Sequence, residues 1–317
     1  AAEGFALVDV DPSSTPGFAG DKAYAQQVLE SGRETLGELQ EKLFAQSRSG
    51  GSAGNVLLVL QAMDTAGKGG IVRHVVGSVD PQGVDLASFG VPTQEEKQHH
   101  YLWRIRKALP RAGRIGVFDR SHYEDVLVVA VHDLVPRQVW EKRFDEINAF
   151  EKELTEQGTV VVKVALFVSA DEQKKRLQER LDRPDKYWKY NPGDVTERLL
   201  WPAYQPADQA VLERTSTDHA PWYALPLAKT WYSRLAMPAM LIVAGNRADR
   251  AAPQTSLDEL RAPPERGGAR GAEALGGGDL SGGAGASSYH RPGCRLGGGH
   301  GGRPPGCPRA PRRGGPE

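Results

Sequence analysis

The sequence contains almost no cysteine. Its two cysteines, Cys294 and Cys307, both lie in the last stretch of the chain. The body before them therefore has no disulfide and no cysteine-based metal site. This distribution fits a protein of a reducing compartment.

Long hydrophobic runs are also missing. No apolar stretch approaches the roughly 20 residues that a membrane-spanning helix needs, and residues 1–20 lack the basic start and apolar middle of a secretory signal. A chain of 317 residues with 39% hydrophobic and 25% charged residues is typical of a globular protein. We therefore expect a cytoplasmic protein without membrane contact.

Residues able to build a core become scarce after Arg261. The segment 262–317 is rich in glycine, proline and arginine, and Tyr289 is its one aromatic residue. Such a composition predicts a disordered tail, although a basic segment can also bind polyanions. We divide the chain into an N-terminal extension (1–20), one domain (21–261) and this tail, to which we assign no function.

The body alternates apolar runs with helical patterns, as parallel sheets covered by helices do. Four runs read as buried strands, and two segments show helical spacing. The strands are expected at 55–60, 114–118, 159–168 and 239–243, and the helices at 22–46 and 137–155. The pattern predicts a three-layer α/β fold with a parallel sheet and helices on both faces.

A phosphate-binding motif follows the first buried strand. The stretch Ala62–Gly70 reads AMDTAGKGG and leads into a helix near Ile71, which is the context of a P-loop, or Walker A motif. Its backbone amides and the helix N-terminus attract phosphate, and Lys68 reaches the transferring groups. The alternative is an ordinary strand-to-helix turn.

The sequence departs from the usual Walker A motif at two positions, and one of them changes which residue can bind the metal ion. Ala62 stands where the first glycine belongs, and Gly69 replaces the hydroxyl residue that normally holds Mg²⁺. Asp64 offers a hard oxygen in its place, and the strand 114–118 leads to Asp119, like a Walker B aspartate. We expect these two carboxylates to share a divalent cation, because bare like charges repel each other.

The segment Phe118–Val126 reads FDRSHYEDV, and together with AMDTAGKGG it resembles the type-2 polyphosphate kinase family. The likeness extends from about residue 20 to 243. Further matching segments are 79–83, 92–96, 101–104, 181–189 and 216–223.

The resemblance implies a role for each matching residue. Asp64 and Asp119 organise Mg²⁺, for which Mn²⁺ is a substitute, while Lys68 and Arg120 hold the phosphates between which transfer occurs. For Arg120 a salt bridge to Asp119 or Glu124 is the alternative. Glu124 is connected with acceptance of both nucleoside mono- and diphosphates. Further residues expected to contact phosphate are Ala66, Gly67, Gly69, Gly70 and Arg73.

A charged helix is expected after the third predicted strand. In residues 171–183, Arg176, Arg180 and Arg183 recur on one face, which suits a lid closing over polyphosphate, or else a solvated face balanced by neighbouring acids. The resemblance favours a helical lid at about 171–205, with Arg180 and Arg183 as its phosphate ligands and a hinge at 191–193.

The histidines match no metal-binding spacing, and we expect a surface or partly buried structural role for His99 and His100. His99 and His100 lie in a helix expected at 94–107.

The resemblance implies reversible transfer of phosphoryl groups between inorganic polyphosphate and AMP, ADP or ATP, with guanine nucleotides as further acceptors. It also implies a homodimer or homotetramer, and we expect no nucleic-acid partner. Two alternatives are an ATP-dependent nucleotide kinase and a non-catalytic, nucleotide-switched module that binds polyanions.

Overall fold

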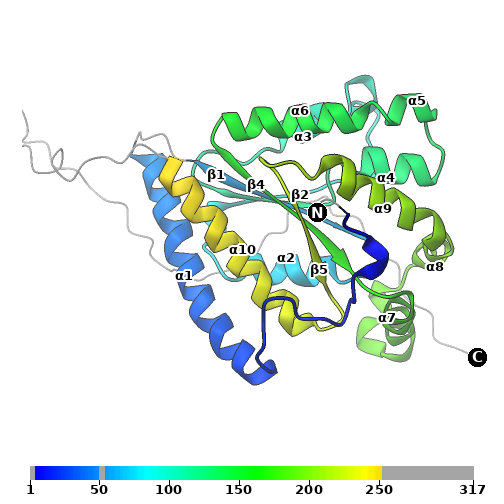
Figure 1. The fold of residues 1–317 in the computed structure, drawn as a ribbon, viewed down its shortest axis with the longest axis horizontal. Coiled ribbons are helices and arrows are strands. Elements are labelled where there is room, and N and C mark those ends of the chain that lie inside the picture. The colour runs from blue at the N-terminus through cyan, green and yellow to red at the C-terminus, as the bar shows by residue number, and fades with distance from the viewer. Residues whose placement is uncertain (1–3, 50–53, 252–317) are drawn as a thin grey trace, which may run out of the picture. The chain divides into compact units, whose positions relative to one another are not determined.

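A five-stranded parallel sheet organises the protein. The computed structural model describes residues 4–49 and 54–251, and the strands pair in the order β2-β3-β1-β4-β5, all parallel (Figure 1). The strands are β1 (Asn55–Ala62), β2 (Val84–Ser88), β3 (Ile115–Asp119), β4 (Thr159–Phe167) and β5 (Trp222–Pro226). The predicted α/β fold with a parallel sheet is confirmed.

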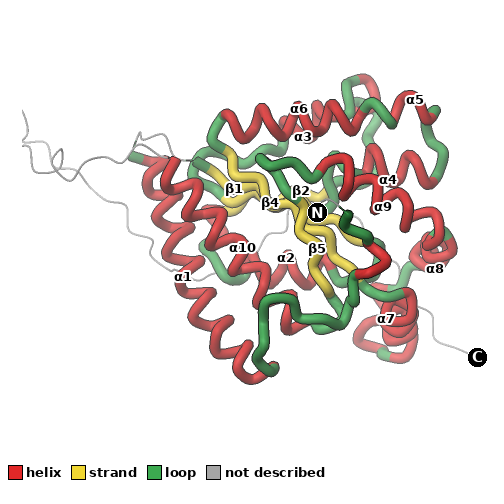
Figure 2. The backbone as a smooth tube through the Cα atoms, viewed as in Figure 1, coloured by secondary structure: helices red, strands yellow, loops and turns green. Residues whose placement is uncertain are grey.

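Helices cover both faces of the sheet (Figure 2). Helices α1, α2 and α10 pack on one face, and α3, α4, α6 and α9 on the other. The helices are α1 (Lys22–Arg48), α2 (Lys68–Val76), α3 (Leu102–Lys107), α4 (Glu124–Val131), α5 (Arg137–Trp140), α6 (Arg143–Glu156), α7 (Ala170–Asp182), α8 (Pro192–Leu199), α9 (Trp201–Thr215) and α10 (Thr230–Ala251). Short 3₁₀ turns are η1 (Leu7–Asp9), η2 (Pro81–Gly83), η3 (Glu96–Gln98) and η4 (Pro184–Lys189).

The central strand β1 explains why its sequence is continuously apolar. Successive side chains of a strand point to opposite faces, so Leu57 packs under α4 and α6 whereas Leu58 packs under α1 and α10. Both side chains are fully buried. A strand covered on both faces leaves no position for a polar alternation.

Two predicted elements differ from the structure. The expected strand 239–243 is wrong, because these residues lie inside helix α10. The expected helix 94–107 is also too long, since α3 begins only at Leu102 and is preceded by the short turn η3. Strands β2 and β5, at the two edges of the sheet, were not predicted.

The strand register brings two loops together. Leu60 of β1 pairs with Asp119 of β3, so the loops that follow these strands leave the same edge of the sheet side by side. Ligands of open parallel sheets bind at this carboxyl edge. None of the helices in the described ranges is both long and apolar enough to cross a membrane.

Candidate active site

The turn between β1 and α2 has the backbone conformation of a phosphate-binding loop. Gly67 adopts a φ of 102°, in the left-handed region that favours glycine. A Cβ atom at Gly67 would lie 3.2 Å from the guanidinium of Arg176. The Gly70 amide already donates to the Gly67 carbonyl at 2.9 Å, so the amides before it at the start of α2 are the ones that can meet an anion. The predicted P-loop therefore has its expected position and shape.

Side chains of helix α7 donate hydrogen bonds to the backbone of the P-loop. The amide of Gln173 donates a hydrogen bond to the Asp64 carbonyl at 2.7 Å. Arg176 donates to the carbonyls of Ala66 and Leu227, the latter at 2.7 Å. These contacts fix the loop carbonyls on the α7 side. Sequence reasoning placed Arg176 on a lid face but did not foresee that it supports the loop.

Four charged side chains meet at the carboxyl edge. The Arg120 guanidinium donates to the Asp64 carboxylate at 2.8 Å. The Lys68 ammonium lies 3.6 Å from the Asp119 carboxylate. The alternative partners weighed for Arg120, Asp119 and Glu124, are therefore not its hydrogen-bond partners in this structure. Each of the two aspartates expected to bind the metal, Asp64 and Asp119, therefore has a basic side chain beside it.

Lys68 and Asp119 are only partly satisfied by each other. The Lys68 Nζ and Asp119 Oδ1 atoms are buried, and neither has a hydrogen-bond partner in the described ranges. Desolvation lowers the pKa of Lys68, while the negative charges of Glu124 and Asp119 oppose that shift. Buried polar atoms without partners are costly, so this pair has capacity left for a phosphate oxygen and a cation.

The donor set fits a divalent cation that is shared with a substrate. No cluster of three or more histidine, aspartate or glutamate side chains suited to a metal occurs in residues 4–49 and 54–251. Mg²⁺ commonly takes one or two protein carboxylates and completes its shell with phosphate oxygens and water. Asp64 and Asp119 match that pattern.

A polar cavity adjoins this charged group. Glu124, at the start of α4, accepts a hydrogen bond from Gln61 at 3.1 Å. Desolvation raises the pKa of Glu124, although Lys68 and Arg120 oppose the rise. The cavity is lined by Gln61, Ala62, Met63, Asp64, Arg120, Glu124, Leu127, Val128, His132, Glu197, Tyr204 and Asp208. Three of these residues could not be predicted from the sequence, because no recognisable motif contains them: Gln61, Glu197 and Asp208.

The predicted lid arginines differ in position. Arg180 donates to Asp194 at 2.6 Å, and the same carboxylate is 3.5 Å from the Thr65 hydroxyl of the P-loop. Arg183 instead pairs with Asp185 at 2.7 Å on the surface. Arg73 lies exposed on α2. The structure thus brings Arg180 to the P-loop, but not Arg183.

His122 and His99 make packing contacts, whereas His132 lines the cavity described above. His122 is buried and lies 3.2 Å from Glu151. His99 stacks on Trp103, with 4.1 Å between the ring centroids.

A P-loop, a strand-end aspartate and a basic helix at one edge of a parallel sheet define a phosphoryl-transfer enzyme of the P-loop class. Residues 20–253 match the family described as Polyphosphate kinase 2 (PPK2). The chain belongs to the polyphosphate kinase 2 family. The predicted family and enzyme class are confirmed.

Individual relatives agree with this assignment. The chain is 45% identical to an AMP/ADP-polyphosphate phosphotransferase of Meiothermus ruber, over 81% of this chain and 95% of that protein. It is 38% identical to an ADP-polyphosphate phosphotransferase of Rhodopseudomonas palustris, over 77% and 87% of the respective chains. The crystal structure of polyphosphate kinase 2 from Arthrobacter aurescens superimposes with a TM-score of 0.77 at 51% identity, covering 83% of this chain and 93% of that one.

Proposed function

We propose that this protein transfers phosphoryl groups reversibly between inorganic polyphosphate and adenine nucleotides, converting AMP to ADP and ADP to ATP. The observation that carries the proposal is the group formed by Asp64, Lys68, Asp119 and Arg120, where two cations face two carboxylates beside a P-loop. Loose transition states of phosphoryl transfer need positioning and charge neutralisation rather than covalent chemistry. GDP is a further acceptor in this proposal.

Each residue has a proposed role. Asp64 and Asp119 would hold Mg²⁺, or Mn²⁺ in its place, which supplies charge neutralisation between the phosphates. Lys68 and Arg120 bind the phosphates on either side of the transferred group, and the pairing of Arg120 with Asp64 keeps its guanidinium aimed there. The amides of the P-loop bind the same oxygens, with Ala66, Gly67, Gly69 and Gly70 as the proposed contacts.

The lid and the remaining residues extend this site. Arg180 is the proposed lid ligand of polyphosphate, because its present carboxylate partner touches the P-loop. Arg183 and Arg73 are proposed to meet the outer part of a long chain, since both are surface residues. Glu124 is proposed to admit both mono- and diphosphates.

The organisation of the molecule is part of the proposal. We place the phosphotransferase domain at 21–261, the lid at about 171–205 and a homodimer or homotetramer in the cytoplasm. The tail 262–317 lies outside the described residues.

A donor and acceptor matrix tests the function. Purified protein with Mg²⁺ is mixed with polyphosphate or ATP as donor and AMP, ADP, GMP or GDP as acceptor, and products are separated by chromatography. We expect ATP from ADP only when polyphosphate is present. Transfer from ATP alone would support a conventional nucleotide kinase, and no turnover with any pair would reject the proposal.

A further inference from the structure

A second cavity lies next to the one beside the P-loop. Its walls are mostly apolar and come from the end of β4, from Trp201 and from the N-terminal segment. The residues that line both cavities are Gln61, Ala62, Met63 and Asp208. The two hollows therefore lie side by side along one backbone stretch and one carboxyl group, which we call the junction.

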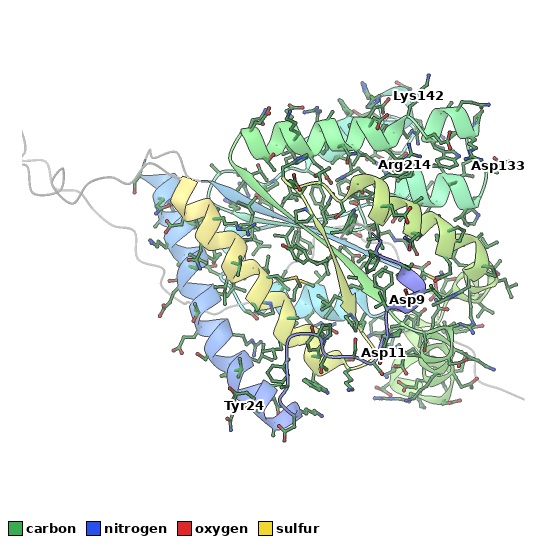
Figure 3. All side chains as sticks on the ribbon, viewed as in Figure 1. Asp9, Asp11, Tyr24, Asp133, Lys142 and Arg214 are labelled. Atoms are coloured by element: carbon green, nitrogen blue, oxygen red, sulfur yellow. The ribbon has the colours of Figure 1, made fainter. Side chains whose placement is uncertain are left out.

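The N-terminal segment covers the second cavity. Leu7, Val8, Val10 and Pro12 contribute to its wall, and Figure 3 shows Asp9 and Asp11 on the same segment, near the ends of β4 and β5. The Leu7 amide donates to Gln209 at 2.7 Å, and Gln209 donates to the Phe5 carbonyl at 2.8 Å. The cover is thus tied to helix α9 beside Asp208.

Two polar groups at the junction lack partners. Gln61 is 5% exposed, and its Oε1 atom is buried without a hydrogen bond in the described part of the chain. Its Nε2 already donates to Glu124, so the side chain is held in one orientation. Asp208 makes no hydrogen bond or ion pair within residues 4–49 and 54–251. An unpaired buried amide oxygen next to a cavity indicates a missing donor.

We propose that the acceptor nucleotide spans the two cavities, with its base in the second one, and that Gln61 and Asp208 recognise the base edge as adenine. Gln61 Oε1 accepts from the exocyclic amine, and the Asp208 carboxyl group donates to a ring nitrogen. Adenine offers that donor and acceptor pair, whereas guanine carries an acceptor oxygen in place of the amine. The inference rests on the proposed function, because it takes the phosphate end of the nucleotide to lie at Arg120.

The surroundings of Asp208 keep its carboxyl group able to donate. Desolvation and the charge of Glu124 raise the pKa of Asp208 to about 7. Other ionisable groups lining the first cavity are Asp64 and Arg120 from the loops, His132 after α4, Glu197 of α8 and Tyr204 of α9. Glu197 accepts from His132 at 2.9 Å and from Tyr204, so its charge is already engaged. Below the pKa Asp208 is a donor, and above it the group becomes an acceptor.

The test compares Asp208→Asn and Asp208→Leu with the wild type. Asp145→Asn on α6 is the matched control, because Asp145 is exposed and lines neither cavity. Rates with polyphosphate and Mg²⁺ give kcat/KM for ADP and for GDP between pH 6 and pH 8.5, and calorimetry gives the affinity of each nucleotide without turnover.

We expect the wild-type preference for ADP over GDP to fall as pH rises through about 7. Asp208→Leu should lower that preference about tenfold, the equivalent of one lost hydrogen bond. The amide of Asp208→Asn keeps a hydrogen-bond donor at every pH. The preference of this variant for ADP over GDP should therefore not change with pH. If Asp208→Leu does not fold, the pH profile of the conservative amide variant decides the question.

An ADP to GDP ratio that is the same in both Asp208 variants and in Asp145→Asn would overturn the base-recognition subsite. Wild-type protein that binds ADP with this preference but transfers no phosphate would instead overturn the proposed function and support the subsite.

Discussion

Lys68 is the residue on which phosphoryl transfer should depend most directly in the proposed site. Its ammonium is partly buried beside Asp119 and has no hydrogen-bond partner in the described ranges. Lys68→Ala should lower kcat by about 10²–10³, the usual cost of removing one group that stabilises transition-state charge. The rate of ATP formation from ADP and polyphosphate measures this loss.

Lys174 on α7 provides the matched control for that substitution, since it is exposed. Lys174→Ala should leave the rate within about a factor of two, as surface charges contribute little. A Lys68→Ala enzyme with wild-type kcat would contradict the phosphate-binding role.

At the residue scale, sequence reasoning succeeded where a motif fixes both residue type and spacing. Asp64, Lys68, Asp119 and Arg120 were predicted from two short segments and do lie together. Gln61 and Asp208 were not predicted, because a glutamine inside a strand and an aspartate inside a helix follow no pattern. Only the packing of α9 against α4 brings Asp208 to the site.

At the scale of elements, a buried ion pair joins β4 to α6. Lys163 donates to Glu151 at 2.6 Å, and both side chains are fully buried. The hydroxyl of Tyr123 also donates to Glu151, at 2.8 Å. Because Tyr123 follows Arg120 closely in the chain, this pair supports the loop that carries Arg120, the proposed phosphate ligand.

Removing one partner of that pair should be costly. Lys163→Met removes the lysine that pairs with a buried carboxylate and leaves Glu151 with His122 and Tyr123, so the free energy of unfolding in urea should fall by about 3–5 kcal/mol. Lys152→Met, which breaks an exposed pair with Glu156, should change it by less than about 1 kcal/mol. If Lys163→Met and Lys152→Met lowered the free energy of unfolding equally, the buried pair of Lys163 and Glu151 would be no more important for stability than an exposed pair.

The same pair predicts a pH dependence. Desolvation would raise the pKa of Glu151, but Lys163 and His122 outweigh it and hold the pKa below its ordinary value. The unfolded state then binds more protons in acid, so the stability from Glu151 is present above the unfolded pKa and is lost as pH falls through the folded one. The double variant Glu151→Leu with Lys163→Met should show a smaller loss of unfolding free energy in acid than the wild type.

The two lid arginines give a further comparison. Arg180 is held by Asp194 next to the P-loop, whereas Arg183 pairs with Asp185 on the surface. Arg180→Ala should therefore raise the KM for polyphosphate about tenfold, and Arg183→Ala by about threefold or less. The measurement is initial rate against polyphosphate concentration at saturating ADP. A larger rise in KM for Arg183→Ala than for Arg180→Ala would indicate that polyphosphate binds along the outer face of α7.

Helices and strands were easiest to predict where the local sequence shows a long apolar run or a clear hydrophobic pattern. The strands β1 and β4 were predicted from their long, continuously apolar runs, and helix α1 was predicted over nearly its full length. Residues 239–243 were read as a strand, because a short apolar run does not distinguish a buried helix from a buried strand. The edge strand β2 reads VDLAS, in which Asp85 and Ser88 hide the strand among polar residues.

At the scale of the whole molecule, the composition change after Arg261 predicts that the fold needs nothing beyond it. A chain truncated after Arg261 should keep its circular dichroism spectrum, its melting temperature and its rate with polyphosphate and ADP. Retained fold with reduced affinity for long polyphosphate would assign the basic tail a polyanion-binding role. Loss of folded protein would contradict the predicted boundary.

The attachment of α7 to the P-loop would limit how the proposed lid moves. Gln173 and Arg176 donate hydrogen bonds from the first half of this helix to carbonyls of the P-loop, so a rigid swing of the entire proposed lid would break these bonds and distort the loop. We therefore expect the pivot of such a lid to lie downstream of this anchored half, and the part that would open to admit a polymer to be shorter than the basic segment as a whole.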